Sequence, residues 1–150
     1  ITGKPDRSDY LKSLGVSKIV MREELEQNNR KPLLAEAYAH GVDTVGGTIL
    51  SNLIKSMSYG GSLAVCGLVA SPKIEASVLP FILRGINVLG VDSVNLPIAK
   101  KTDTWGKLAS DWKLNILSDI AQEIELKQIS KAIEEIFAGK TIGRIVIAHK

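Results

Sequence analysis

The residue types at the start of the chain are those that proteins use to bind phosphate. Thr2 offers a hydroxyl, Gly3 a backbone amide and Lys4 an ammonium, and no carboxylate precedes Asp6. Arg22, at the end of a short apolar run, adds a guanidinium whose planar donors suit phosphate oxygens. The alternative is that Lys4 and Arg22 are solvated surface charges. Taken alone, the residue types favour this second interpretation.

Glycine pairs are the other candidates for a phosphate site. Gly46-Gly47 follows a predicted strand and Gly60-Gly61 ends a predicted helix, but neither has the G-x-G-x-x-G spacing that cradles a pyrophosphate. We therefore expect both pairs to serve turns, because glycine adopts positive φ at little cost. The sequence also contains no Walker A loop and no Gly-x-Ser-x-Gly nucleophile elbow.

The single cysteine, Cys66, cannot form an internal disulfide, and this fits a reducing, cytoplasmic location. No Lys, Arg or His is adjacent to it, so we expect a small buried core thiol and no nucleophile. The two histidines, His40 and His149, are far apart in sequence, and no metal site is predicted. His40, beside Gly41, is expected to be a charge partner at a helix end.

The elements that must position these residues alternate between short apolar runs and helical stretches. This alternation is typical of βαβ units with a parallel sheet. Residues 62–67 are apolar enough for a central strand buried on both faces. In the late helix, Ile129, Ile133, Ile136 and Phe137 are expected to face inward, as are Trp105 and Trp112 in the helix before it. Predicted strands cover 18–21, 42–45, 62–67, 86–91 and 143–148; predicted helices cover 10–14, 33–39, 49–57, 78–83, 102–113 and 129–137, with a charged loop at 23–30.

Composition excludes several classes of protein. The 150 residues are 45% hydrophobic and 23% charged, which is typical of one soluble globular domain. The net charge of +3 is too small to indicate nucleic-acid binding without a clustered basic patch. No apolar run approaches the ~18 residues that a membrane helix needs, so no membrane association is predicted.

Four segments resemble a known family. They are TGKPDRSDYLKSLG at 2–15, VDTVGG at 42–47, YGGSLAVCGL at 59–68 and PFILRGINVLGVDSV at 80–94. Taken together, the chain resembles the medium-chain dehydrogenase/reductase superfamily. Within it, the chain is similar to the zinc-independent quinone oxidoreductases of the YhdH/YhfP type and the NADPH-dependent acrylyl-CoA reductases. The resemblance implies an α/β fold, a Rossmann-type doubly wound and mostly parallel sheet that lacks its first βαβ unit.

The resemblance assigns the N-terminal residues to a cofactor. In Rossmann domains that bind NAD, the second strand ends in a carboxylate that binds the ribose 2′-hydroxyl. Here Thr2, Gly3 and Lys4 stand in that place, and Arg22 holds the matching basic position. A carboxylate would repel a 2′-phosphate, whereas these groups attract one, so the implied cofactor is NADPH.

A second group of residues lies at the carboxyl ends of predicted strands, where open α/β sheets bind ligands. By resemblance, Val45 approaches the adenosine half of the cofactor, the segment from Cys66 lies near the nicotinamide, and the backbone from Val91 binds the carboxamide. Arg144 would reach the cofactor phosphates, or else is an ordinary charge at the start of a strand. The implied cofactor-binding residues are Thr2, Gly3, Lys4, Arg22, Val45, Cys66, Gly67, Leu68, Val91, Ser93 and Arg144; no catalytic residue and no metal ligand is assigned.

The implied activity of the intact protein is hydride transfer from NADPH to a small molecule, either an enoyl thioester resembling acrylyl-CoA or a quinone-like acceptor. The resemblance also implies a homodimer that pairs through the strand from Ile86 to Val91, whose flat apolar character suits an edge. Two alternatives remain. One is a non-catalytic nucleotide-binding or interaction module. The other, nucleic-acid binding through Lys4, Arg7, Lys12 and Lys18, is disfavoured by Asp6 and Asp9 between them.

The chain begins with Ile1, and the resemblance implies that it is the C-terminal half of a longer protein. Residues 1–150 would then be the C-terminal part of an NADPH-binding domain, with about 113–150 returning toward a substrate domain. The first strand, at the centre of the sheet, would be missing, and apolar flanks of its neighbours would be exposed. An intact mass about twice that of this chain, with a glycine-rich turn upstream, is expected of the native protein.

Overall fold

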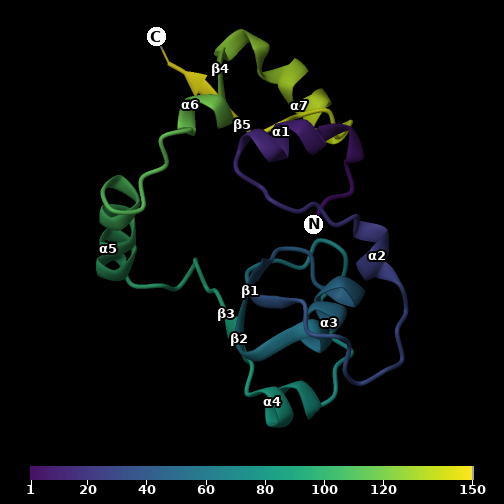
Figure 1. Cartoon of the computed structure of the whole chain (residues 1–150). Coiled ribbons are helices and arrows are strands. Elements are labelled where there is room, and N and C mark those ends of the chain that lie inside the picture. Colours follow the sequence, from purple (N-terminus) through teal and green to yellow (C-terminus); the bar gives the residue numbers. More distant parts are fainter. Residues whose placement is uncertain (150) are drawn as a thin grey trace. The chain divides into compact units, whose positions relative to one another are not determined.

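The computed structural model describes residues 1–149 and divides into two units, Ile1–Leu96 and a second that begins at Pro97 (Figure 1). Each unit is an α/β arrangement with parallel strands. The first unit contains α1 (Ser8–Ser13), α2 (Arg22–Glu26), β1 (Tyr38–Asp43), α3 (Gly47–Ser56), β2 (Met57–Val65), α4 (Leu79–Arg84) and β3 (Asn87–Gly90). The second contains α5 (Ile98–Ala109), α6 (Leu117–Ile120), β4 (Ala121–Glu125), α7 (Ile129–Phe137) and β5 (Arg144–Ala148).

A three-stranded parallel sheet in the order β1-β2-β3 is the centre of the first unit. Val42 is opposite Ala64, and Ala64 is opposite Leu89, so β2 is the central strand as predicted. The apolar side chains of α3 pack on β1 and β2, as the spacing of residues 49–57 predicts. The core consists of Leu25, Ile49, Leu50, Leu53, Ile54, Met57, Leu63 and Ile86.

A separate parallel bridge joins Thr2 to Met21, outside both sheets. It replaces the predicted strand at 18–21. The two backbone hydrogen bonds that form it run from Thr2 N to Val20 O at 3.0 Å and from Arg22 N to Thr2 O at 2.8 Å. β1 is an edge strand of the three-stranded sheet, and its Val42 side chain is 72% exposed. The bridge and β1 are therefore not paired with each other.

The predicted helix at 33–39 is wrong. This segment leads into β1, which begins at Tyr38, and Leu34 N donates to Lys55 O at 2.9 Å. Backbone bonds to the end of α3, and pairing with β2 from Tyr38 onward, override the helical spacing of the apolar residues, a common outcome when propensity is weak. His40 therefore lies on a strand, where its Nδ1 is 2.8 Å from Ser62 Oγ, and not at a helix end.

Other boundaries also differ from the prediction. The expected loop at 23–30 begins with the short helix α2, because Leu25 is buried in the core and holds one face of the turn. Gly60-Gly61 lies within β2, which starts directly after α3, and does not end a helix. The sequence pattern does not predict β4, since only Ile124 of its five residues is buried and its glutamates obscure the alternation.

The second unit pairs β4 with β5 in parallel, from Ala121 opposite Arg144 to Glu125 opposite Ala148. The predicted inward stripe of α7 is wrong for its main members. Phe137 is 87% exposed and Ile136 54%, because this short unit has no layer to cover them. Trp105 and Trp112 are also exposed, at 69% and 56%. Apolar faces in this unit are consequently left in contact with solvent.

Arg84, the last residue of α4, ties several segments of the first unit together. Its Nη1 donates to Lys55 O at 2.9 Å and Met57 O at 3.0 Å, and its Nη2 donates to Leu34 O at 2.6 Å. Its Nε lies 3.4 Å from Glu36 Oε1, and its side chain is 13% exposed. A largely buried guanidinium thus satisfies carbonyls at the junction of α3 and β2 and in the approach to β1.

Replacing Arg84 with alanine is expected to lower the free energy of unfolding by about 3 kcal/mol, because three carbonyls lose a charged donor. Chemical denaturation of the native protein measures this. Arg30→Ala, at an exposed arginine, is the matched control and is expected to change stability by less than about 0.5 kcal/mol. Equal stability of the two variants would contradict the assignment.

Candidate functional site

The N-terminal residues and Arg22 meet in the structure, as predicted. The bridge between Thr2 and Met21 places Arg22 next to Gly3, where a β-carbon added to the glycine would lie 3.0 Å from the guanidinium carbon. Lys4 N donates to Thr2 Oγ1 at 3.0 Å, which fixes the turn between them. Gly3, Lys4 and Arg22 are exposed, so a ligand can reach this surface. We call Thr2, Gly3, Lys4 and Arg22 the N-terminal cluster.

Arg22 owes its position to the way α2 begins. Met21 N donates to Glu24 Oε1 at 3.0 Å, which closes the first turn, and Arg22 N is already held by Thr2 O. Among residues 1–149 no ion pair involves Arg22. The arrangement therefore presents a guanidinium against Gly3, between the hydroxyl-bearing Thr2 and the ammonium-bearing Lys4 in the chain, and these side-chain types suit a phosphate monoester.

The carboxyl ends of the three parallel strands form a second site. The ladder continues past the strands, since Cys66 N donates to Asp43 O and Val91 N donates to Val65 O, both at 2.9 Å. Five predicted residues, which we call the strand-end cluster, lie along this edge: Val45, Cys66, Gly67, Leu68 and Val91. Leu68 is 63% and Val91 52% exposed. Apolar surface and backbone groups are thus available at the edge where open sheets bind ligands.

Cys66 is exposed, so the expectation of a buried core thiol is wrong. The strand ends one residue earlier, at Val65, and leaves the thiol on the edge of the sheet. Its Sγ lies 3.5 Å from Asp43 O, a weak contact for a thiol donor.

Asp43 is a site residue that the sequence analysis missed. Its side chain is 3% exposed, and its Oδ2 accepts hydrogen bonds from Gly46 N at 2.8 Å and Val45 N at 3.2 Å. The carboxylate therefore shapes the turn between β1 and α3 and holds Val45 in place. The signal was available, since an aspartate at the end of a strand and three residues before a glycine is typical of an Asx turn.

Two glycines allow the backbone to pack closely at this edge. Gly46 has φ +74°, and a side chain there would collide with Ser71 O, so its predicted role in a turn is confirmed. A side chain at Gly67 would collide with the backbone carbonyl of Thr44. Close approach between the turn after β1 and the segment after β2 therefore depends on both glycines.

Ser93 lies in a turn that Asp92 organises. Asp92 Oδ1 accepts from Val94 N at 2.9 Å and Asn95 N at 3.0 Å, and Oδ2 accepts from Asn95 Nδ2 at 2.9 Å. The bonds from the Asn95 backbone and side chain, and then from Val94, hold the pKa of the Asp92 carboxyl below its ordinary value of 3.8. Asp92 thus caps a turn and leaves Ser93 exposed beside Val91.

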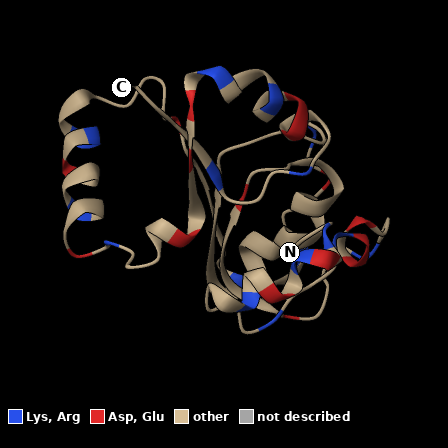
Figure 2. Cartoon of the chain, turned by 90° about the horizontal axis from the view of Figure 1, so that it is seen from above, with Lys and Arg blue, Asp and Glu red and all other residues tan. Residues whose placement is uncertain are grey.

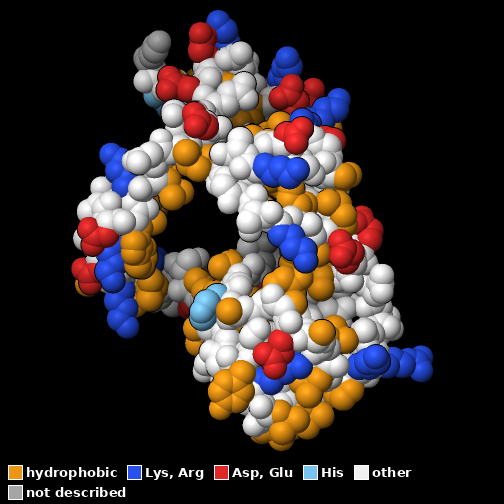
Figure 3. Space-filling view, in the orientation of Figure 1, with side chains coloured by type: hydrophobic (Ala, Val, Ile, Leu, Met, Phe, Trp, Pro, Cys, Tyr) orange, Lys and Arg blue, Asp and Glu red, His pale blue; other side chains and the backbone are white. Residues whose placement is uncertain are grey.

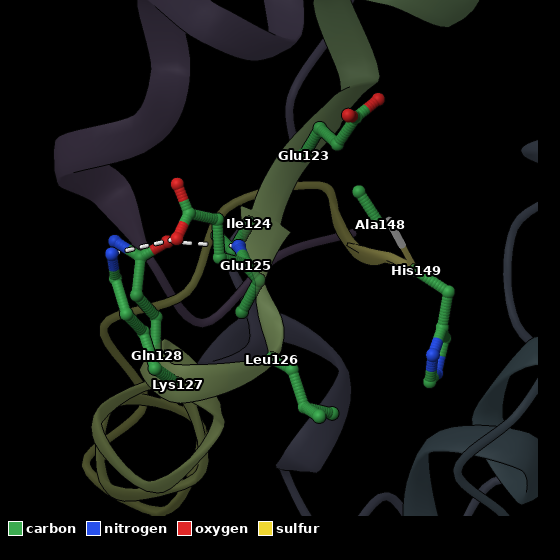
Figure 4. Close-up of a pocket in the computed structure, with 8 residues that line it drawn as sticks. All are labelled: Glu123, Ile124, Glu125, Leu126, Lys127, Gln128, Ala148 and His149. Carbon is green, nitrogen blue, oxygen red and sulfur yellow. Dashed lines mark hydrogen bonds and ion pairs between the residues drawn. The ribbon is translucent and has the colours of Figure 1, made fainter.

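Arg144 lies in the second unit, at the start of β5, where its side chain is exposed and its Nη1 donates to Gly143 O at 3.2 Å. Its contribution to cofactor binding stays a prediction. A hollow in the same unit, at the carboxyl ends of β4 and β5, contains none of the predicted residues (Figure 4). There Lys127 Nζ pairs with Glu125 Oε2 at 2.7 Å, and the side chains of Glu123 and His149 point apart.

Metal-binding and membrane-spanning features are both missing from the part of the chain that the structure describes. Within residues 1–149, no three His, Cys, Asp or Glu side chains are grouped so that they could hold a metal ion. In that same range no helix is long and apolar enough to cross a membrane. Basic and acidic residues are interspersed along the chain (Figure 2).

Comparison with known proteins gives a family match. A family model described as zinc-binding dehydrogenase matches residues 1–112. The chain is 37% identical over 147 residues to the acrylyl-CoA reductase AcuI of Ruegeria pomeroyi, covering 98% of this chain and 44% of that protein. It is 36% identical over 147 residues to the putative quinone oxidoreductase YhfP of Bacillus subtilis, covering 97% and 44%. The chain thus spans less than half the length of these relatives.

Solved structures agree with the fold. The crystal structure of Escherichia coli YhdH with bound NADPH superposes with a TM-score of 0.86 at 34% identity, covering 97% of this chain and 45% of that one. That of Bacillus subtilis YhfP with NAD bound gives 0.91 at 36% identity, covering 98% and 45%. The predicted α/β fold of the Rossmann type is confirmed.

Gly67→Ala is expected to destabilise the native protein by about 2 kcal/mol, because the new methyl group displaces the Thr44 carbonyl. Gly90→Ala is the matched control at the end of the neighbouring strand, where a side chain meets nothing within 4 Å. Thermal and chemical denaturation compare the two. A loss in Gly90→Ala as large as that in Gly67→Ala would show that close approach is not the cause.

The stability of the folded protein is expected to depend on pH through the Asp92 turn. Since the pKa of Asp92 is lowered in the folded protein, its contribution to stability is complete above pH 3.8 and is lost as the pH falls through the folded value. Asn95→Ala removes the side-chain donor and is expected to raise the pKa of Asp92 toward 3.8, measured by NMR titration of the carboxyl carbon. Asn28→Ala, outside this turn, is the control; an unchanged pKa in Asn95→Ala would refute the assignment.

Proposed function

Because the chain belongs to the zinc-binding dehydrogenase family, we propose that the intact protein is an NADPH-dependent reductase that transfers hydride to a small-molecule acceptor. The observation that carries the proposal is the N-terminal cluster, in which Arg22 lies against Gly3 beside Thr2 and Lys4. The proposed acceptor is an activated alkene such as an enoyl thioester, or a quinone. Its support is similarity to an acrylyl-CoA reductase and to a putative quinone oxidoreductase.

The choice of NADPH rests on this chain's own residues, since YhdH was crystallised with NADPH and YhfP with NAD. The N-terminal cluster fits the extra phosphate of NADPH: the guanidinium and ammonium supply positive charge, and Thr2 supplies a hydroxyl. A carboxylate, which suits the free ribose 2′-hydroxyl of NADH, is not part of this cluster. The donor set therefore favours NADPH over NADH.

Each part of the chain has a proposed role in binding. The N-terminal cluster would hold the 2′-phosphate, and the strand-end cluster with Ser93 would orient the remaining cofactor by backbone bonds and apolar contact. Arg144 would neutralise phosphate charge. NADPH supplies the hydride when bound, and the protein supplies orientation and charge. In this proposal no zinc ion takes part, and no residue of the chain is assigned as proton donor to the substrate.

Exposed apolar surface supports a larger and dimeric protein. The uncovered residues Ile136 and Phe137 of α7 are those expected if residues from about 113 onward contact a substrate domain. β3 is an edge strand, and Leu89 on it is 54% exposed, which supports sheet pairing between two copies through the strand from Ile86 to Val91. Hydrophobic side chains also cover α4 nearby (Figure 3).

A cytoplasmic location is proposed from the free thiol of Cys66.

In the native protein, Arg22→Ala is expected to lower kcat/KM for NADPH about 10- to 100-fold, because one charged hydrogen-bond donor to the phosphate is lost. kcat/KM for NADH is expected to change by less than about twofold, since NADH lacks that phosphate. Steady-state kinetics with both cofactors measure the change. Lys12→Ala, an exposed lysine outside the cluster, is the control.

Two results would contradict parts of the proposal. A wild-type preference for NADH, or an equal loss with both cofactors in Arg22→Ala, would refute the role of the N-terminal cluster. Binding of NADPH without turnover of enoyl thioesters or quinones would instead favour a non-catalytic nucleotide-binding module.

A further inference from the structure

Asn52, in the middle of α3, is buried and its side chain forms hydrogen bonds with the end of α2. It is 3% exposed, and its Nδ2 donates to Leu25 O and to Gln27 O, each at 2.8 Å. These carbonyls belong to the last turn of α2 and its C-cap, where a helix leaves acceptors without partners. One buried amide therefore satisfies two of the acceptors at this helix end.

α2 has five residues and depends on such contacts. An isolated helix of this length is not stable in water, so tertiary contacts must hold it. Its end toward α3 is fixed by Asn52 and by the buried Leu25 side chain. Its first residue, Arg22, is fixed through the backbone by Thr2 O. The backbone from which the Arg22 side chain projects is thus held between the bridge on one side and α3 on the other.

Helix α3 also contacts the segment that follows α2. Lys55, one turn after Asn52 and 8% exposed, donates from Nζ to Asn29 O at 2.9 Å. α3 itself begins at Gly47, directly after the turn that Asp43 holds. Helix α3 therefore connects the strand-end cluster to the segment that carries Arg22.

The bonding of Asn52 shows which of its atoms matters. Its Oδ1 is buried and has no hydrogen-bond partner among the described residues, which disfavours an asparagine at this place. Both protons of Nδ2, in contrast, are used on α2 carbonyls. The two donor bonds are therefore the only hydrogen bonds that the Asn52 side chain makes among the described residues, and both end on α2 and its C-cap.

We infer that Asn52 is a positioning residue that, by clamping α2 to α3, places the Arg22 guanidinium for the 2′-phosphate and so sets the preference for NADPH over NADH. The inference rests on the proposed function. Asn52 touches neither the N-terminal cluster nor the cofactor in this scheme, and it acts only through α2. Small displacements of a supporting group are enough to weaken a charged contact that depends on geometry.

The test uses Asn52→Ala in the intact native protein. kcat/KM for NADPH is expected to fall about tenfold while that for NADH changes less than about twofold. Ser56→Ala is the matched control, since Ser56 lies on the same helix, is 5% exposed and donates only to Asn52 O within α3. Its cofactor ratio is expected to equal that of the wild type, even if its melting temperature falls.

A double-mutant cycle separates positioning from general destabilisation. In the Arg22→Ala background, Asn52→Ala is expected to leave the NADPH-to-NADH ratio unchanged, because the residue it positions is gone. Equal loss with both cofactors in the single variant, or an additive change in the double variant, would overturn the inference. If Asn52→Ala does not fold, Asn52→Ser, which retains one donor, takes its place, and its NADPH-to-NADH ratio is expected to fall below that of the wild type and of Ser56→Ala.

The two proposals fail differently. If Arg22→Ala does not change the NADPH preference, the assignment of the N-terminal cluster fails. If Arg22→Ala abolishes the preference while Asn52→Ala and Asn52→Ser leave it intact, only the role of Asn52 fails. Hydrogen exchange of the α2 amides gives an independent readout, and faster exchange in Asn52→Ala than in Ser56→Ala is expected.

Discussion

The parallel alignment of β1 and β3 on either side of β2 is the constraint on which the first unit depends. Parallel strands bring their carboxyl ends to one edge, so residues far apart in sequence, such as Val45 and Val91, lie near the same edge of the sheet. The alignment is held by the apolar face of α3, with Leu50, Leu53 and Ile54 buried. Burial of that face is favourable enough to impose strand geometry on neighbouring segments with weaker preferences.

Buried polar side chains then fix the connections that the apolar core leaves undefined. Asp43 shapes the turn after β1, Asn52 holds the end of α2, and Arg84 satisfies carbonyls around the start of β2. Each binds backbone groups outside a regular ladder, which would otherwise lose their partners on burial. The candidate site is consequently built on backbone positions set by side chains that do not themselves face a ligand.

Several apolar residues with the spacing of core residues are exposed, because the described chain contains no element that covers them. Val42 on the edge strand β1 and Phe137 on α7 are largely uncovered in the described chain, although their spacing is that of core residues. The chain spans less than half the length of its curated relatives. Amphipathic spacing predicts that a face is meant to be covered, but it does not say which element covers it.

The sequence by itself determined the class of fold, the helices α3 and α7 and the central place of β2, whereas binding of a phosphate by Thr2, Lys4 and Arg22 is implied by the family resemblance and stays a prediction. These depend on local periodicity and on the chemistry of side chains, which a sequence displays directly. Tertiary structure alone decided that the segment from Tyr38 is a strand, that Cys66 is exposed and that Asn52 holds the end of α2. The physical reason is that ladder pairing and buried hydrogen bonds join residues such as Leu25 and Asn52, whose proximity no local pattern records.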